Sequence, residues 1–356
     1  MKMIFRWFPH GDDSVRLEQI RQIPGMTGVA TALYHIPVGE VWPLADILAV
    51  RDEIHAAGLE MEVIESVNIH EDIKKGLPSR DSFIAKYIET MRNLHEAGVK
   101  CICYNFMPVM DWARSNLAEL LSDGSTAMAY NHNQVMLMEP HSMADSMLQG
   151  ANNFSLPGWE PERFPVMAKD IEFYKNVSTD EYFQNISYFL QAVMPYAEEY
   201  DIDFAIHPDD PPWPLFGLPK VITAADTIRR FLSLNNSPRN GIAFCTGSLG
   251  ANQANDLPSM IREFAGAGRI PFAHLRNLKH TSEKDFHETA HLSRCGDLDM
   301  FEIVKALSDS GFDGYIRPDH GRMIWGELGR PGYGLYDRAL GSNYLLGLWE
   351  AIKKMS

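Results

Sequence analysis

The feature that most constrains the fold of this chain is a regular alternation between short apolar stretches and amphipathic helical stretches. Such alternation is typical of a parallel sheet covered by helices. The strand-type stretches are MIFRWF (3–8), GVATAL (28–33), LEMEVIES (59–66), VKCICYNFMP (99–108), DFAIHP (203–208), GIAFCT (241–246), IPFAHLRN (270–277) and GYIRPD (314–319). Because eight parallel strands close into a barrel, the pattern predicts an α/β fold, a (β/α)8 (TIM) barrel, with residues 1–356 forming a single domain.

Amphipathic helical stretches separate these strands. Their apolar residues recur at helical spacing, and glycines close several of them. The predicted helices cover residues 14–23, 44–58, 81–98, 180–200, 223–234, 257–268, 299–311 and 335–355. Proline has no amide hydrogen, so Pro195 is expected to bend or end the helix over 180–200. Residues 279–297, between the last two strands, are expected to form a polar, histidine-rich loop.

The repeat is interrupted once, by residues 107–179. This segment is too long for an ordinary connection and too rich in Trp, Tyr, Phe and Met for a disordered linker. We interpret it as an insertion after the fourth strand that packs over the barrel mouth or against a partner subunit. Its aromatic content makes a homodimer the expected assembly.

Charge and composition exclude several kinds of partner and location. A formal net charge of −15 argues against nucleic acid, whose phosphates require an excess of Lys and Arg. The sequence has no apolar run near the ~20 residues that span a bilayer, and its start does not resemble a signal peptide, so we expect a cytoplasmic protein. Four cysteines are too few for a disulfide framework. Cys101 and Cys103 are expected to be buried thiols on one face of a strand.

The last four predicted strands each end in a residue that can bind a metal. These residues are His207, Cys245, His274 and Asp319, about 30 to 45 positions apart. Because the carboxyl ends of barrel strands meet on one face, the four side chains are expected to converge there. A single histidine at a strand end is more often structural, but one shared site explains all four positions better than four unrelated roles. Two imidazoles suit Zn²⁺, Fe²⁺ or Mn²⁺, a thiolate favours Zn²⁺ or Fe²⁺, and a carboxylate favours harder ions. The pattern predicts a metal-dependent enzyme.

Two residues near the last strand are candidates for proton transfer. His320 follows a candidate ligand directly and can exchange a proton near neutral pH. Tyr333 lies in the glycine-rich stretch GRPGYG, which could fold over the barrel mouth. A phenol near a cation could act as an acid or a base, although a packed loop aromatic is the simpler interpretation.

Four further residues are candidates for substrate contacts. Arg276 and Asn277 follow the seventh strand, where a guanidinium could hold a carboxylate and an amide could hold a hydroxyl. Asn105 and Trp7 end the fourth and first strands and are expected to line the pocket.

Long motifs in order along the whole chain resemble the mannonate dehydratase family. They are MKMIFRWFP, VIESVNIHEDIK, CYNFMPVMDWAR, FAIHPDDPPWPLFGLPK, GIAFCTGSLG, FAHLRN and RPDHGR. The resemblance implies a xylose-isomerase-like barrel that removes water from D-mannonate to give 2-keto-3-deoxy-D-gluconate. It further implies a role in hexuronate catabolism and a requirement for Mn²⁺ or Fe²⁺.

Carried over residue by residue, the resemblance implies that the same four residues bind the metal. It implies that His320 and Tyr333 are the catalytic pair, with Tyr336 as a neighbouring alternative to Tyr333. Asn68, in ESVNIHED, stands where the family usually has proline, and it lies off the metal set.

Two other functions fit the same predicted barrel. A sugar isomerase or epimerase would use a similar site, but such sites favour several carboxylate ligands. A sugar-acid sensor would bind without turnover, which leaves His320 and Tyr333 without a purpose. The expected partner is in each case a small sugar or sugar acid. The sequence does not distinguish Mn²⁺ from Fe²⁺, or the acid from the base.

Overall fold

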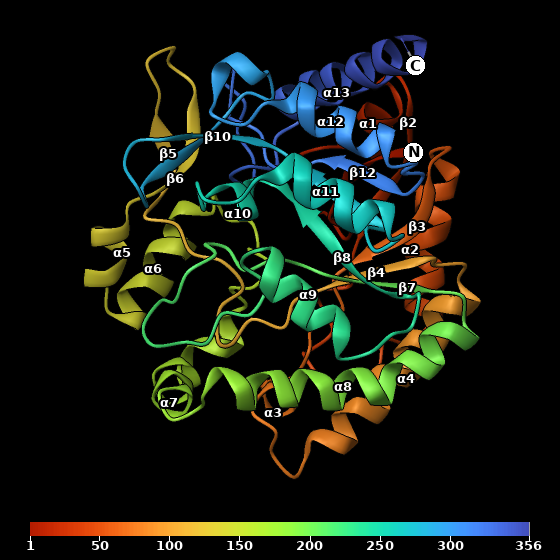
Figure 1. Ribbon diagram of the computed structural model, residues 1–356, viewed down its shortest axis with the longest axis vertical. Helices are drawn as coiled ribbons and strands as arrows, with labels where there is room; N and C mark the ends of the chain where they lie inside the picture. The colour runs from red at the N-terminus through yellow and green to blue at the C-terminus, as the bar shows by residue number, and fades with distance from the viewer. Residues whose placement is uncertain (356) are drawn as a thin grey trace.

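The computed structural model describes residues 1–355, except the side chains at 140, 141 and 161. Eight parallel strands of this part of the chain close into a barrel in the order β1-β12-β9-β8-β7-β4-β3-β2 (Figure 1). They are β1 Lys2–Arg6, β2 Met26–Thr31, β3 Glu60–Glu65, β4 Cys101–Tyr104, β7 Asp203–Ile206, β8 Asn240–Cys245, β9 Phe272–Leu275 and β12 Tyr315–Pro318. Each overlaps a predicted strand, so the predicted (β/α)8 barrel is confirmed.

Alternate residues of these strands fill the barrel. The interior layer takes side chains from all eight strands, namely Ile4, Ala30, Val63, Cys101, Cys103, Ala205, Ala243, Phe272 and Tyr315. Cys101 and Cys103 are both buried and unpaired with other cysteines, as predicted. Successive side chains of a strand point to opposite faces, so a residue two positions beyond this layer shares its inward face. That inward face leads to the barrel mouth.

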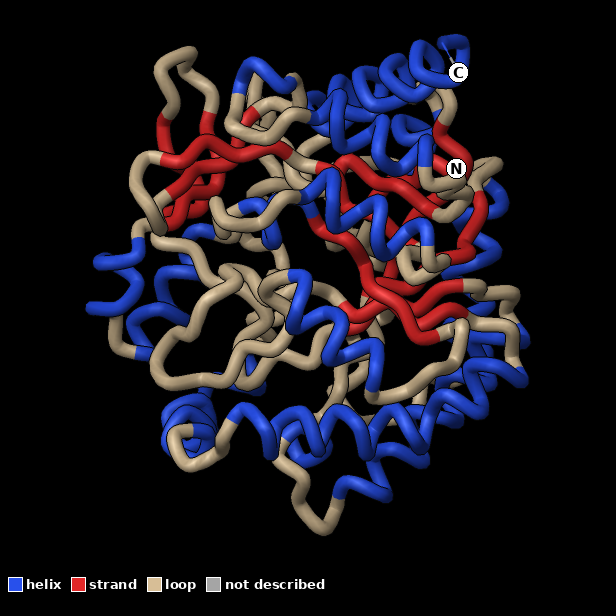
Figure 2. Tube along the Cα trace, in the orientation of Figure 1, coloured by secondary structure: helices blue, strands red, loops and turns tan. Residues whose placement is uncertain are grey.

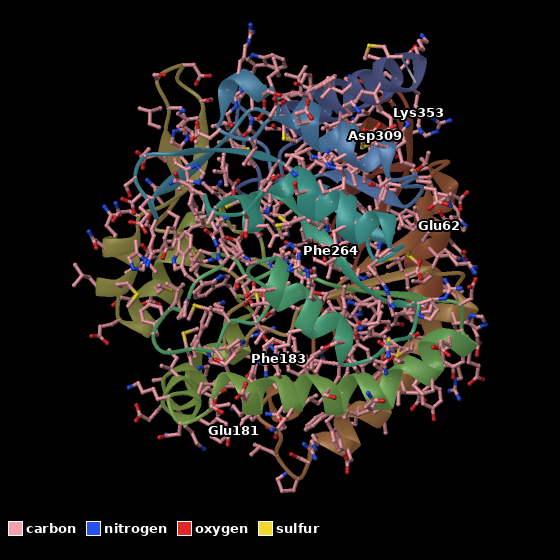
Figure 3. All side chains as sticks on the ribbon, in the orientation of Figure 1. Glu62, Glu181, Phe183, Phe264, Asp309 and Lys353 are labelled. Atoms are coloured by element: carbon pink, nitrogen blue, oxygen red, sulfur yellow. The ribbon has the colours of Figure 1, made fainter. Side chains whose placement is uncertain are left out.

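Helices cover the outside of the barrel (Figure 1). The predicted helices correspond to α1 Leu17–Arg21, α2 Leu44–Ala56, α4 Arg80–Glu96, α8 Thr179–Glu199, α9 Ala225–Ser233, α11 Leu257–Gly266, α12 Met300–Asp309 and α13 Tyr336–Met355. The short helices α3 Glu71–Lys74 and α10 Thr246–Gly250 add to them. Phe183 on α8 and Phe264 on α11 are buried, whereas Glu181 and Lys353 are exposed (Figure 3). Within residues 1–355, the helices are too short or too polar to cross a membrane.

Helix α8 does not end at Pro195 but continues to Glu199. Of the two expected outcomes, a bend or an end at this proline, the end is therefore wrong. A proline in a helix removes one backbone hydrogen bond. Around it, Val193, Met194 and Ala197 are buried, and this packing holds the last turn in place.

A second, antiparallel sheet lies beside the barrel (Figure 2). Its order is β10-β11-β6-β5, with β5 Asn116–Leu120, β6 Thr126–Tyr130, β10 Asn277–His280 and β11 Phe286–Thr289. The expectation of a loop over 279–297 is wrong for these strands, because β11 pairs with β6 of the insertion, Phe286 opposite Tyr130. The insertion also forms α5 His132–Leu137, α6 Pro140–Gly150, the 3-10 turn Pro161–Arg163 and α7 Phe164–Tyr174. A further 3-10 turn covers Ser293–Cys295.

Candidate active site

The candidate metal ligands share the inward face of neighbouring strands. His207, Cys245 and His274 each lie two positions beyond a member of the interior layer. Because side chains alternate along a strand, all three point into the barrel mouth. Cys245 is in register with His274, and His274 with Arg317 of β12.

The ligand atoms of His207, Cys245 and His274 all lie within 4.8 Å of one another. Ligands around one zinc-type ion lie roughly 3.3 to 3.8 Å apart, given metal–N and metal–S distances of about 2.1 and 2.3 Å. Small rotations therefore bring the three atoms around one cation. Asp319 adjoins the group through Oδ2, which lies 3.2 Å from the Cys245 sulfur. The structure thus places the four predicted ligands together, three in a compact group and Asp319 at its side.

The two imidazoles suit a bound cation. His207 Nδ1 lies 2.7 Å from the Pro208 carbonyl oxygen, so Nδ1 donates its hydrogen there and Nε2 is the ligand atom. His274 Nε2 is buried and has no hydrogen-bond partner among the described residues. Burial lowers the pKa of both rings, so both are neutral at pH 7, as metal ligands must be. A bound ion would satisfy the orphaned nitrogen of His274.

The thiol and the carboxylate complete a donor set for a divalent ion. Ser248 donates to the Cys245 sulfur from its hydroxyl at 3.1 Å. Burial, together with the charge of Asp319, raises the pKa of this thiol to about 12, so a cation is needed to hold it as a thiolate. Burial also opposes ionisation of Asp319, but nearby cations, Arg317 at 2.7 Å foremost, hold its pKa well below the usual range. Two neutral imidazoles, a thiol and an ionised carboxylate fit the expected metal.

His320 and Tyr333 are in contact beside this group. His320 Nε2 lies 3.1 Å from the Tyr333 hydroxyl, and His320 Nδ1 lies 3.0 Å from Glu288. Burial favours the neutral form of Glu288, but His320 and Arg276, which approaches the same edge of the ring, lower its pKa to about 2. An ionised carboxylate only accepts, so the Glu288 contact favours a hydrogen on Nδ1, which leaves Nε2 to accept from Tyr333. Burial raises the pKa of Tyr333 against the opposing charge of Arg317, so the phenol is protonated at neutral pH. The pair is arranged to move protons.

Arg276 is buried in a network of charged side chains. It donates to Glu288 at 2.7 Å and to Asp210 at 2.8 Å. Arg114 donates to the same two carboxylates, at 2.9 and 2.8 Å. The Arg276 side chain also packs onto Gly247, where a Cβ atom would lie 1.7 Å from Nε, so only glycine fits there. Since these contacts occupy both terminal nitrogens of Arg276, it acts on a bound carboxylate chiefly through its charge.

Sequence reasoning missed Glu288, Asp210 and Arg114. Asp210 follows the candidate ligand His207 by three residues, and this proximity is a usable signal. Glu288 lies on β11 and Arg114 in the insertion, and only the pairing of distant segments brings them to Arg276.

One cavity extends from the candidate ligands His207 and Asp319 to His320 and Tyr333. Its lining includes Arg6, Glu65, Asn105, Asp111, Trp112, His207, Arg276, Arg317, Asp319, His320 and Tyr333. Asn105, a predicted pocket residue, donates to Asp111 at 3.0 Å. Asp111 and Trp112 belong to the segment 107–179, so this segment contributes to the cavity wall.

Trp7 and Asn277 lie outside this lining, and the roles expected for them are corrected. Arg6 and Arg276 line the cavity, and in an extended chain the next residue points to the opposite face. The Trp7 indole donates to a backbone carbonyl at 3.2 Å. The Asn277 amide donates to two backbone carbonyls of the following loop, at 3.0 and 3.2 Å. Both side chains support local structure.

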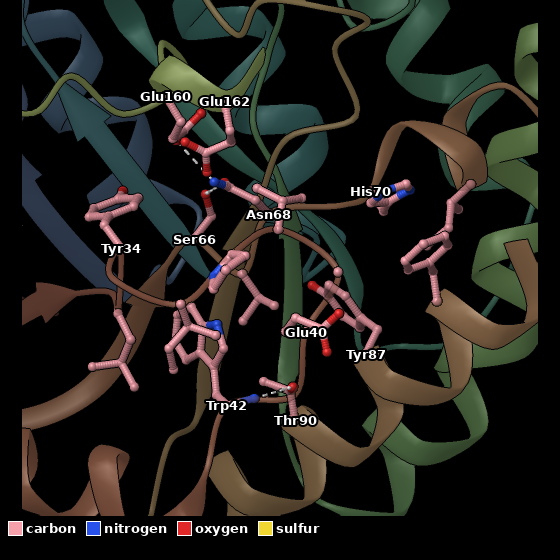
Figure 4. A pocket seen from close by; sticks show the side chains of 18 residues that line it. Tyr34, Glu40, Trp42, Ser66, Asn68, His70, Tyr87, Thr90, Glu160 and Glu162 are labelled. Carbon is pink, nitrogen blue, oxygen red and sulfur yellow. Dashed lines mark hydrogen bonds between the residues drawn. The ribbon is translucent and has the colours of Figure 1, made fainter. Parts of the chain in front are cut away.

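A second hollow adjoins the cavity and shares Tyr34 and Ser66 with it (Figure 4). Arg6 donates to the Tyr34 hydroxyl at 2.7 Å, which fixes this part of the wall. Asn68 lines the hollow and donates to Glu160 at 3.0 Å. Asn68 therefore lies in this hollow and not among the candidate metal ligands.

Comparisons with known proteins agree over the whole chain. The family model of D-mannonate dehydratase (UxuA) matches residues 1–356. A mannonate dehydratase of Thermotoga neapolitana is 57% identical over 355 residues, covering 100% of this chain and 99% of that protein.

Solved structures agree as well. The crystal structure of mannonate dehydratase from Streptococcus suis serotype 2 superposes with a TM-score of 0.90 at 44% identity, covering 100% of this chain and 95% of that one. A xylose isomerase domain protein from Planctomyces limnophilus shares the fold, with a TM-score of 0.58, 14% identity and 99% coverage of both chains. The expected xylose-isomerase-like barrel is confirmed, as is the resemblance seen in the motifs. This chain belongs to the D-mannonate dehydratase family.

Proposed function

We propose that this hydro-lyase converts D-mannonate to 2-keto-3-deoxy-D-gluconate in hexuronate catabolism and holds Mn²⁺ or Fe²⁺ at His207, Cys245, His274 and Asp319. The observation that carries the proposal is the contact between His320 and Tyr333, 3.1 Å apart beside the ligand group and in the same cavity. Relatives named mannonate dehydratase along the whole chain support the substrate.

The reaction needs a base for the C2 proton and an acid for the C3 hydroxyl. Because burial keeps Tyr333 protonated, the phenol donates a proton to the departing hydroxyl, which leaves as water. His320 takes the C2 proton on Nε2, and Glu288 stabilises the imidazolium that forms. The resulting enol converts to the 2-keto acid without a further protein group.

Removal of the C2 proton places negative charge on the neighbouring carboxylate. Arg276 and Arg317 line the cavity, and their positive charges stabilise that charge where it develops. A divalent ion, when bound, supplies further positive charge to the same carboxylate. Asp210, Glu288 and Glu65 hold the two guanidinium groups in position, at 2.7 to 2.8 Å.

Turnover of D-mannonate by the whole chain, stripped of metal with a chelator, tests the proposal. We expect the 2-keto-3-deoxy acid to form only after Mn²⁺ is added. His320→Asn protein should bind Mn²⁺ without turnover. Full activity without metal would contradict the metal requirement. Interconversion of aldoses, or binding of D-mannonate without turnover, would instead assign an isomerase or a sensor.

We also propose that the enzyme is cytoplasmic and homodimeric. The support for a dimer is the aromatic content of residues 107–179. Sedimentation velocity tests the assembly directly.

A further inference from the structure

We infer that the barrel mouth contains a second metal position, formed by Glu65, Cys103 and His274, which takes a thiol-seeking divalent cation such as Zn²⁺ or Cd²⁺. The ligand atoms of these residues all lie within 4.8 Å of one another. A carboxylate, a thiolate and an imidazole suit such an ion, and three protein ligands leave a fourth position for water. The inference goes beyond the proposed function, because two of the three ligands are different and no dehydration step is involved.

Strand register explains why these side chains meet. Glu65 at the end of β3 is directly in register with Cys103 of β4. Cys103 belongs to the interior layer, and Glu65 follows Val63 of that layer by two positions, so both point inward. His274 reaches the same space from β9, with Nε2 3.6 Å from a Glu65 oxygen. Three separate strands therefore supply the three donors.

The ring of His274 provides a second observation, since its free nitrogen can serve either position. Its Nε2 atom is buried and has no hydrogen-bond partner among the described residues, a costly condition that a cation would relieve. Its Nδ1 atom lies 3.3 Å from the Arg317 guanidinium, where a cation is repelled, so Nε2 is the ligand atom. Arg317 also holds Glu65 in place at 2.7 and 3.0 Å, and each carboxylate oxygen keeps a lone pair for a metal.

The two metal positions exclude one another. His274 belongs to both groups, and one ring nitrogen binds one cation. When an ion binds at Glu65 and Cys103, the thiol releases its proton to solvent and a sulfur–metal bond forms. This ion takes the imidazole away from His207 and Cys245. A thiol-seeking cation here would compete with the ion proposed for catalysis.

Titration of the whole metal-free chain with Cd²⁺ separates the two positions, because each cadmium–thiolate bond adds a charge-transfer band in the near ultraviolet. The exposed Cys295 is first replaced by serine in every protein, so that only buried thiols respond. In this background, Cys245→Ser protein is expected to bind one Cd²⁺ and to show the band. Adding Cys103→Ser should remove the band. Adding Cys101→Ser instead, a matched change of a buried thiol on the same strand, should preserve it.

Circular dichroism and thermal unfolding establish that each variant is folded before titration. Glu65→Gln is the second variant, and in the Cys245→Ser protein it should raise the Cd²⁺ concentration at half-saturation. With Cys103 and Cys245 both present, one Cd²⁺ per chain is expected. The absence of a thiolate band in folded Cys245→Ser protein, or a band that survives Cys103→Ser, would overturn the site. Two Cd²⁺ per chain would overturn the exclusion between the positions.

Discussion

Glu288 determines which nitrogen of the His320 ring carries the hydrogen. The carboxylate accepts from Nδ1 at 3.0 Å, and it also balances the charges of Arg114 and Arg276. Glu288→Gln keeps the shape, but its amide can turn a donor toward Nδ1, which moves the ring hydrogen to Nε2. We expect kcat to fall roughly 10²- to 10⁴-fold with little change in KM, since this is what a general acid–base step contributes. Steady-state kinetics at saturating Mn²⁺ check this, with exposed Glu283→Gln as the control. An unchanged kcat in Glu288→Gln would contradict the role.

The positions of site residues that follow the inward–outward alternation of a strand could be predicted from the sequence, and the positions of the others could not. His207, Cys245 and His274 each lie within one residue of the end of a strand with a clear apolar pattern, so their positions at the mouth follow from sequence. Trp7 and Asn277 lie one position out of phase with the inward face. The sequence around Glu288 does not mark it as a site residue, because its role depends on charged side chains that other segments of the chain bring to it.

The antiparallel sheet is the element that carries Glu288 to the barrel. On β11, Phe286 is buried and stacks on Tyr130 of β6, with ring centroids 5.5 Å apart. We expect Phe286→Ala to cost about 3 to 5 kcal/mol of unfolding free energy. We also expect it to lower kcat, because Glu288 two residues on is held less firmly. Mn²⁺ affinity should not change, since the ligands lie on other strands. Urea unfolding and Mn²⁺ titration measure both, with exposed Leu120→Ala on β5 as the control. Loss of Mn²⁺ binding in Phe286→Ala would contradict the expectation that the antiparallel sheet positions Glu288 but not the proposed metal ligands.

The same sheet marks the limit of prediction from sequence at the scale of elements. The barrel strands alternate with helices, so each is recognised from its neighbours along the chain. In contrast, β6 pairs with β11, about 150 residues later, and the strands of this sheet are only four or five residues long. Strands this short show little alternation, and their pairing depends on the finished barrel. The aromatic insertion could be recognised as packed structure, but its partner strands could not.

At the scale of the whole molecule, the proposed metal site makes Mn²⁺ binding a measure of the closed barrel. His207 and Asp319 lie more than a hundred residues apart, so the unfolded chain does not gather the ligands. An ion that binds only the folded state stabilises it by about 2.7 kcal/mol when its concentration is 100 times Kd. We therefore expect Mn²⁺ to raise the Tm of chelator-stripped protein. His207→Ala should lose most of this rise, and exposed His55→Ala should retain it. Differential scanning calorimetry with and without Mn²⁺ measures each shift against the metal-free Tm of the same variant, which removes any direct effect of the substitution. If the full rise persisted in His207→Ala, Mn²⁺ would be binding elsewhere, and the barrel strands would not be joined through the ion.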